Sequence, residues 1–152
     1  MATVEVTFTP LPAHVRTARL VATAVARRSG VDEALLDEVR LAVGEACSRA
    51  VEAHQRHCPA EPVKIEMTDQ DERFVVVVSD HAPTKTDGPA SANGRGVSPA
   101  GAVTVVQGAD DGGIPAGFGL AVISGLADDV HVSSTSSGVS VRMSWPSAAA
   151  TA

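Results

Sequence analysis

The sequence has few aromatic residues: no tyrosine, one tryptophan and three phenylalanines among 152 residues. Hydrophobic residues nevertheless make up 44% of the chain. A buried core must therefore be built from valine, alanine, leucine and isoleucine. The length fits one domain that is large enough to bury such a core.

Other features are also missing. No apolar run approaches the ~20 residues of a membrane span, and the N-terminus is unlike a signal peptide. The formal net charge is -6 and there is no basic run, which argues against direct binding of nucleic acid. The two cysteines, Cys47 and Cys58, have neither metal-site nor disulfide spacing. These absences predict a cytoplasmic, reduced protein without membrane or nucleic-acid partners, in which Cys47 is a small core residue.

Hydrophobic periodicity divides the first part of the chain into a strand and two helices. Thr3 to Thr9 alternates like a half-exposed strand. Ala13 to Arg28 repeats apolar residues at helical spacing, and Gly30 is a natural stop. Asp32 is a natural N-cap for a second helix that runs to about His54. Its predicted inward residues are Leu35, Leu36, Val39, Ala42, Val43, Ala46 and Ala50.

Strands predominate in the rest. Val63 to Met67 and Arg73 to Ser79 are predicted strands, and the four-valine centre of the second should be buried on both faces. Val130 to Ser134 and Val139 to Trp145 predict a hairpin across residues 136–138. The order of elements predicts an α+β sandwich with the helices on one face of the sheet.

Residues 81–116 differ in composition, with seven glycines, four prolines and few large apolar residues. They predict a mobile, protease-sensitive loop, in which Val103 to Val106 could form a short element. A short apolar helix should follow over Gly117 to Leu126. We therefore expect one domain over residues 1–146 and a frayed tail over 147–152.

Three segments resemble a known family. Val39-Arg-Leu-Ala-Val-Gly-Glu-Ala-Cys47, Gly117-Phe-Gly-Leu120 and Gly138-Val-Ser-Val-Arg-Met143 together resemble the GHKL (Bergerat, histidine kinase-like) ATPases, specifically the RsbW-type anti-sigma factor serine kinases. The resemblance implies a two-layer α/β sandwich with a mixed, mostly antiparallel sheet and a long ATP lid over residues 81–116. It also implies ATP and Mg²⁺ as cofactors. The implied partners are a sigma factor, a STAS-domain anti-anti-sigma factor and a second copy of the chain.

The resemblance also implies roles for individual residues. Glu45 matches the general base that takes a proton from a serine hydroxyl of the partner. Asp80 matches the aspartate that accepts a hydrogen bond from the adenine amino group. Gly117 and Gly119 match the glycines that let backbone amides approach the phosphates.

Four positions depart from the family pattern. Arg49 replaces the asparagine that holds Mg²⁺, and a guanidinium has no lone pair for a metal. Ala82 and Thr84 replace two glycines and add Cβ atoms near the base. Val139 replaces a threonine and removes a hydroxyl from the adenine end. Together the departures predict a degenerate nucleotide site with weak or absent kinase activity.

Simpler explanations exist for several of these residues. Glu45 and Arg49 are four apart with the acid first, which favours a helical ion pair of ~0.2–0.5 kcal/mol. Asp80 could cap the turn after its strand, and the glycines could serve only flexibility and packing. His54, His57 and Cys58 do not predict a metal site, since a helix end separates them and no fourth ligand converges. The arginines of the first helix form either a solvated face or a docking surface for an acidic partner; they are Arg16, Arg19, Arg27 and Arg28.

Two functions follow as hypotheses. The first is an anti-sigma-like regulator that acts by protein binding with an impaired nucleotide site. The second is an active Mg-ATP-dependent serine kinase that phosphorylates a STAS partner. Arg49, Ala82, Thr84 and Val139 favour the first, whereas the retained Glu45, Asp80, Gly117 and Gly119 favour the second. A remodelled pocket for another small ligand is a third, weaker interpretation. The metal position favours the regulator, because a triphosphate that faces Glu45 without Mg²⁺ meets like-charge repulsion.

Overall fold

The computed structural model describes residues 2–82 and 122–147. Their elements are β1 (Ala2–Phe8), α1 (Pro12–Ser29), a short 3₁₀ helix η1 (Glu33–Leu35), α2 (Leu36–His57), β2 (Val63–Gln70), β3 (Arg73–Ser79), β4 (Asp129–Thr135) and β5 (Gly138–Pro146). Residues 122–126 add a helical turn before β4. The predicted element at Val103 to Val106 and the start of the predicted helix at Gly117 lie outside the described residues.

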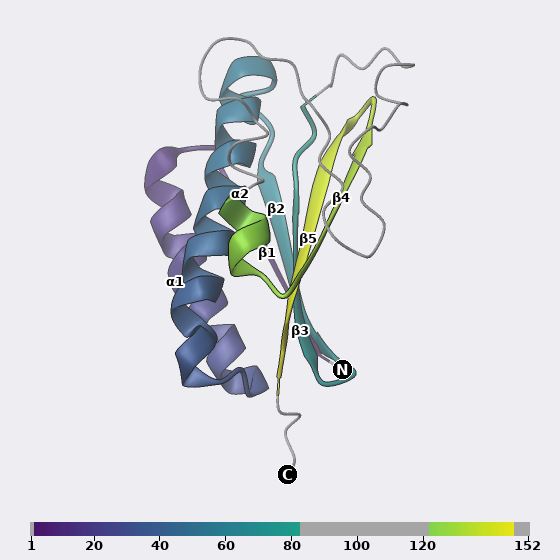
Figure 1. The fold of residues 1–152 in the computed structure, drawn as a ribbon. Helices are drawn as coiled ribbons and strands as arrows, with labels where there is room; N and C mark the ends of the chain where they lie inside the picture. Colours follow the sequence, from purple (N-terminus) through teal and green to yellow (C-terminus); the bar gives the residue numbers. More distant parts are fainter. Residues whose placement is uncertain (1, 83–121, 148–152) are drawn as a thin grey trace.

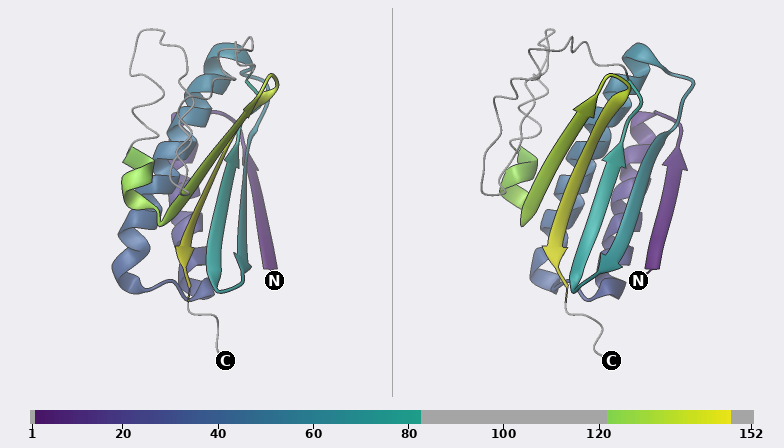
Figure 2. Two further views of the ribbon diagram at one scale, coloured as in Figure 1. Left: turned by 45° about the vertical axis from the view of Figure 1, so that its right-hand side comes forward. Right: turned by 90° about the vertical axis from the view of Figure 1, so that its right-hand side faces the viewer.

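The strands form one sheet in the order β1-β2-β3-β5-β4, and all four pairings are antiparallel. Helices α1 and α2 lie side by side on one face of this sheet, and the short turn at 122–126 lies on the same side (Figures 1 and 2). The expected two-layer α+β sandwich is confirmed. Among the described helices, none is long and apolar enough to span a bilayer.

Helix α1 begins and ends as its sequence predicts. Pro12 occupies the first turn, where its missing N–H costs nothing. Gly30 ends the helix in the left-handed conformation, with φ 92°. Asp32 is an N-cap, accepting a hydrogen bond from the Ala34 N–H at 3.0 Å, although it caps η1 rather than α2 itself.

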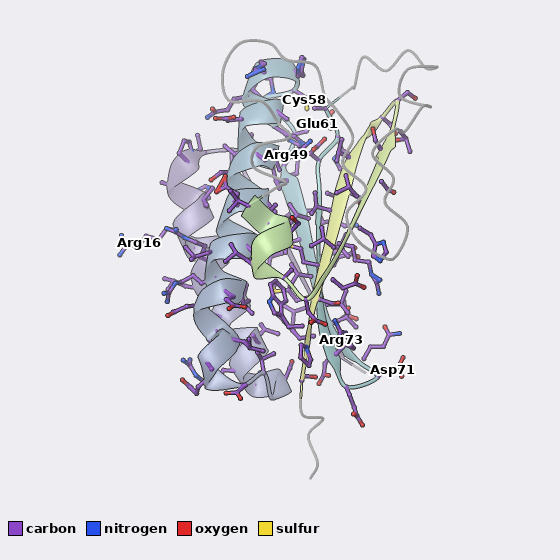
Figure 3. The ribbon with its side chains drawn as sticks, in the orientation of Figure 1. Arg16, Arg49, Cys58, Glu61, Asp71 and Arg73 are labelled. Carbon is purple, nitrogen blue, oxygen red and sulfur yellow. The ribbon has the colours of Figure 1, made fainter. Side chains whose placement is uncertain are left out.

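The arginine face of α1 is largely exposed. Arg16 points away from the molecule (Figure 3), and Arg27 and Arg28 are exposed as well. Arg19 is half-buried, because its aliphatic stem lies over α2 at Gly44, where an added Cβ would meet it at 2.5 Å. One of the four arginines therefore packs between the helices.

Helix α2 supplies much of the core. Six of its seven predicted inward residues are buried, and the seventh, Leu35, is half-buried against the core at the junction with η1. Cys47 is fully buried, as expected of a small core residue. The helix continues three residues past the predicted end, to His57.

Strand β3 corrects one expectation. Val75, Val76 and Val78 are buried, but Val77 is half-buried. The prediction that this centre is buried on both faces is therefore wrong for Val77. The reason is that α1 and α2 cover only one face of the sheet (Figure 2).

Candidate functional site

The candidate site lies where the last turns of α2 approach the end of β3. Glu45 and Arg49 are one turn apart on α2, and Asp80 directly follows β3. Arg49 lies between α2 and the sheet (Figure 3). This arrangement brings Arg49 and Asp80 together although they are 31 residues apart in sequence.

The Asp80 carboxylate accepts three intramolecular hydrogen bonds. Its Oδ2 accepts from Arg49 Nη1 at 3.0 Å. Its Oδ1 accepts from the backbone N–H of Ala82 at 3.0 Å and of Val139 at 3.2 Å. The Asp80 side chain is 1% exposed, whereas that of Arg49 is 19% exposed. A buried carboxylate requires such compensation, and here the chain supplies it from its own residues.

The backbone of Asp80 is also held by β5. The Asp80 N–H donates to the Val139 carbonyl at 2.9 Å. Gly138, next to Val139, has φ 152°, and a Cβ there would collide with the Asp80 carbonyl oxygen. The glycine of the Gly138 to Met143 motif is therefore required by close backbone approach. The bond from Ala82 to Asp80 Oδ1 is an Asx turn, so Asp80 does cap the turn after its strand.

His54 is a site residue that the sequence analysis placed only at the approximate end of the second helix. It is fully buried. Its Nε2 accepts from the His81 backbone N–H at 2.8 Å, and its Nδ1 lies 2.8 Å from the Glu61 carbonyl. Because a backbone N–H can only donate, Nε2 is unprotonated and Nδ1 carries the proton. No sequence pattern gives this role, since both partners lie outside α2.

Glu45 does not pair with Arg49. The Glu45 side chain is half-buried, and no hydrogen bond or ion pair holds it among the residues the structure describes. The predicted helical ion pair is wrong because Arg49 turns to Asp80 instead. A buried carboxylate without a cation is far more costly than a half-exposed one, so Asp80 competes better for the guanidinium.

The remaining predicted residues divide into two groups. Ala82 is buried, and Val139 is half-buried against the core. Their contribution to Asp80 is the backbone amide rather than the side chain. Thr84, Gly117 and Gly119, with most of the predicted lid, lie outside the described residues.

The two cysteines have raised pKa values. Burial raises the pKa of the Cys47 thiol from 9.0 to about 12, against a smaller opposing effect of Arg19. Burial, followed by the carboxylates of Glu61 and Asp80, raises the pKa of Cys58. Neither thiol is activated as a nucleophile. Among residues 2–82 and 122–147, no cluster of His, Cys, Asp or Glu could hold a metal ion.

The described residues do not fit Mg-ATP in the way that the resemblance implies. Arg49 offers donors where a magnesium ion needs oxygen ligands. The acceptor for an adenine amino group, Asp80, already receives a donor at each oxygen. A base at Oδ2 would have to share that oxygen with Arg49.

Comparisons with known proteins agree with this architecture. The sequence matches the histidine kinase-like ATPase domain family over residues 8–145. No curated protein sequence matches. A crystal structure of the RsbU and RsbW domains of a Mycobacterium tuberculosis protein is similar, with a TM-score of 0.65, 13% sequence identity and 97% of this chain covered. This chain spans only 33% of that longer chain, and at this identity the likeness shows a shared fold alone.

Proposed function

Because the chain belongs to the family of histidine kinase-like ATPase domains, we propose that it is an RsbW-type anti-sigma regulator that acts by binding proteins. It exchanges between a sigma factor and a STAS-domain anti-anti-sigma factor in the cytoplasm, without efficient phosphoryl transfer. It acts as a single domain over residues 1–146, as a monomer or homodimer. Its nucleotide site is impaired at Arg49, Ala82, Thr84 and Val139.

The ion pair between Arg49 and Asp80 carries this proposal. It joins the position expected to hold Mg²⁺ to the position expected to bind adenine, at 3.0 Å. A nucleotide would have to share the Asp80 carboxylate with Arg49 and bring its triphosphate, without a metal ligand at position 49, to face the Glu45 carboxylate. Both requirements weaken binding.

Calorimetry with Mg-ATP tests the impaired site. We expect no saturable binding at millimolar nucleotide, with or without Mg²⁺. Micromolar affinity would contradict the proposal. Partner binding is tested separately, by titrating the protein with purified sigma factors and STAS proteins of its source organism. Failure to bind any of them would remove the regulatory role.

A second candidate, an active serine kinase, is favoured by one observation. The Glu45 carboxylate is half-buried and is not neutralised by Arg49, so it remains able to accept a proton from a partner serine. In this alternative Asp80, Gly117 and Gly119 bind ATP. Transfer of the γ-phosphate from radiolabelled ATP to a purified STAS partner, lost in Glu45→Gln, would establish the kinase and overturn the regulator.

The single change Arg49→Asn separates the two departures from the family pattern. It restores a possible metal ligand, but Ala82 and Val139 still depart at the adenine end. We therefore expect little gain in Mg-ATP affinity. A large gain, measured by the same calorimetry, would show that only the metal position had been lost.

A further inference from the structure

We propose that Arg49 and His54 are positioning residues that hold residues 80–82 in place without any nucleotide, so that partner binding does not depend on ATP. The statement about partners rests on the proposed function. The statement about positions does not, because it concerns contacts within the free chain.

Two consecutive residues after β3 are tied to the same helix. Asp80 is bound through its side chain by Arg49 at 3.0 Å, and His81 donates its backbone N–H to His54 at 2.8 Å. Arg49 and His54 both extend from α2, whose buried face packs in the core. His54 is itself oriented by the Glu61 carbonyl at 2.8 Å. The segment therefore rests on a rigid element rather than on a loop.

The contact with Asp80 holds a guanidinium that is only partly hydrogen-bonded. Its Nε is buried and has no hydrogen-bond partner among the described residues. A donor left in this state is costly, and the contact with Asp80 is the interaction that offsets the cost. The Arg49 side chain is thus held between α2 and the sheet by the Asp80 carboxylate, which would otherwise be a buried charge without a cation.

The third tether comes from β5. The Val139 backbone both donates to Asp80 Oδ1 at 3.2 Å and accepts from the Asp80 N–H at 2.9 Å. Residues 80–82 are thereby joined to α2 and to β5 at once. A ligand can shift such an arrangement only by binding two conformations with different affinity. A nucleotide therefore adds little order to residues 80–82, because their contacts are already made without it.

Amide hydrogen exchange of the free protein tests the positional statement. Arg49→Met keeps the length of the side chain but removes its donors. We expect exchange at the Ala82 and Val139 amides to become about ten- to hundredfold faster, as loss of a hydrogen bond to a charged group predicts. Arg49→Lys keeps a cation and should restore most of the protection.

Arg40→Met is the matched control. Arg40 lies on the same helix and pairs with Asp37 at 2.6 Å, but both side chains are exposed. Its loss should leave the Ala82 and Val139 amides unchanged. Unchanged exchange in Arg49→Met would overturn the proposal. If that variant does not fold, Arg49→Met with Asp80→Asn removes both charges, and the same acceleration is then expected relative to the wild type.

His54 is tested through a different amide. His54→Leu removes the acceptor for the His81 N–H, so exchange at His81 should become at least about tenfold faster. His54→Gln keeps an acceptor oxygen on a side chain of similar reach and should retain more protection. Equal exchange in His54→Leu and the wild type would remove His54 from the proposal.

Partner affinity tests the regulatory statement. We expect the dissociation constant for a purified STAS or sigma partner to agree within about twofold with and without millimolar Mg-ATP, whereas allosteric coupling is commonly about 5- to 150-fold. A tenfold or larger change would overturn the inference and leave the proposed partner binding intact. If no partner binds but exchange is faster in Arg49→Met, the proposed partner binding fails and the statement about the positions of residues 80–82 stands.

Discussion

A residue at which two backbone segments approach closely tolerates few substitutions, and Gly138 is the clearest case in this chain. Gly138→Ala places a Cβ against the Asp80 carbonyl at φ 152°. We expect a loss of unfolding free energy of about 2 kcal/mol or more. Urea unfolding followed by the fluorescence of Trp145 measures it. Gly125→Ala is the control, because nothing lies within 4 Å of its added Cβ; it should be neutral or slightly stabilising. Equal midpoints for the two variants would contradict the prediction.

Cys47 makes the free energy of unfolding depend on pH in the alkaline range. Its pKa is raised from 9.0 to about 12 by burial, so the unfolded thiol ionises before the folded one. The contribution to stability is complete below pH 9 and is lost as the pH rises towards 12, by at most about 1.4 kcal/mol per pH unit. Denaturant unfolding across this range should show the decline, and Cys47→Ala should reduce its slope. The chain has no tyrosine to obscure the effect. An unchanged slope in Cys47→Ala would exclude Cys47 as the cause.

Helical spacing predicted which residues lie one turn apart on α2, but not which distant residue would pair with Arg49. It correctly placed Glu45 and Arg49 one turn apart, yet it gave no sign that Asp80, 31 residues further on, would take the guanidinium. The role of His54 was missed for the same reason. Its partners are backbone groups of Glu61 and His81, which leave no trace in side-chain chemistry. The sequence therefore identified Arg49 and Asp80 as candidate site residues, whereas their pairing with each other followed only from the fold.

At the scale of elements, the turn between β2 and β3 is strained. Asp71 and Glu72 have φ of 52° and 60°, the left-handed region that a two-residue hairpin demands and that glycine adopts most readily. Glu72→Gly should raise the unfolding free energy by about 0.5–1 kcal/mol. The same change at Glu66, inside β2, should lower it. Thermal unfolding compares the two, and a destabilised Glu72→Gly would contradict the prediction.

This turn also explains where the predicted boundaries failed. Strand β3 has the predicted bounds, and Gly30 and Asp32 mark helix ends as expected. Strand β2 instead runs three residues past Met67 to Gln70. A turn of Asp71 and Glu72 contains neither glycine nor proline, so the sequence shows no break there. Chain reversals built from ordinary residues are the ones that periodicity does not locate.

For the whole molecule, the core predicts a single unfolding transition. Trp145 is buried in β5, packs near Phe74 and donates its indole N–H to the Leu126 carbonyl at 3.1 Å. It therefore reports on the sheet and on the turn at residues 122–126 together. We expect its fluorescence and the far-ultraviolet circular dichroism of the helices to change at the same urea concentration. Two separate midpoints would contradict one domain over residues 1–146.

The contact between Arg49 and Asp80 has a consequence for what the cell could signal through this protein. Because Arg49 is part of α2, its contact with Asp80 is intramolecular. The contact is therefore kept when the ATP concentration falls. Binding that requires ATP depends on the ATP concentration as well as on the partner. Under our proposal, this protein would respond to the relative abundance of its partner proteins alone. Starvation that lowers the ATP concentration would not change its partner binding.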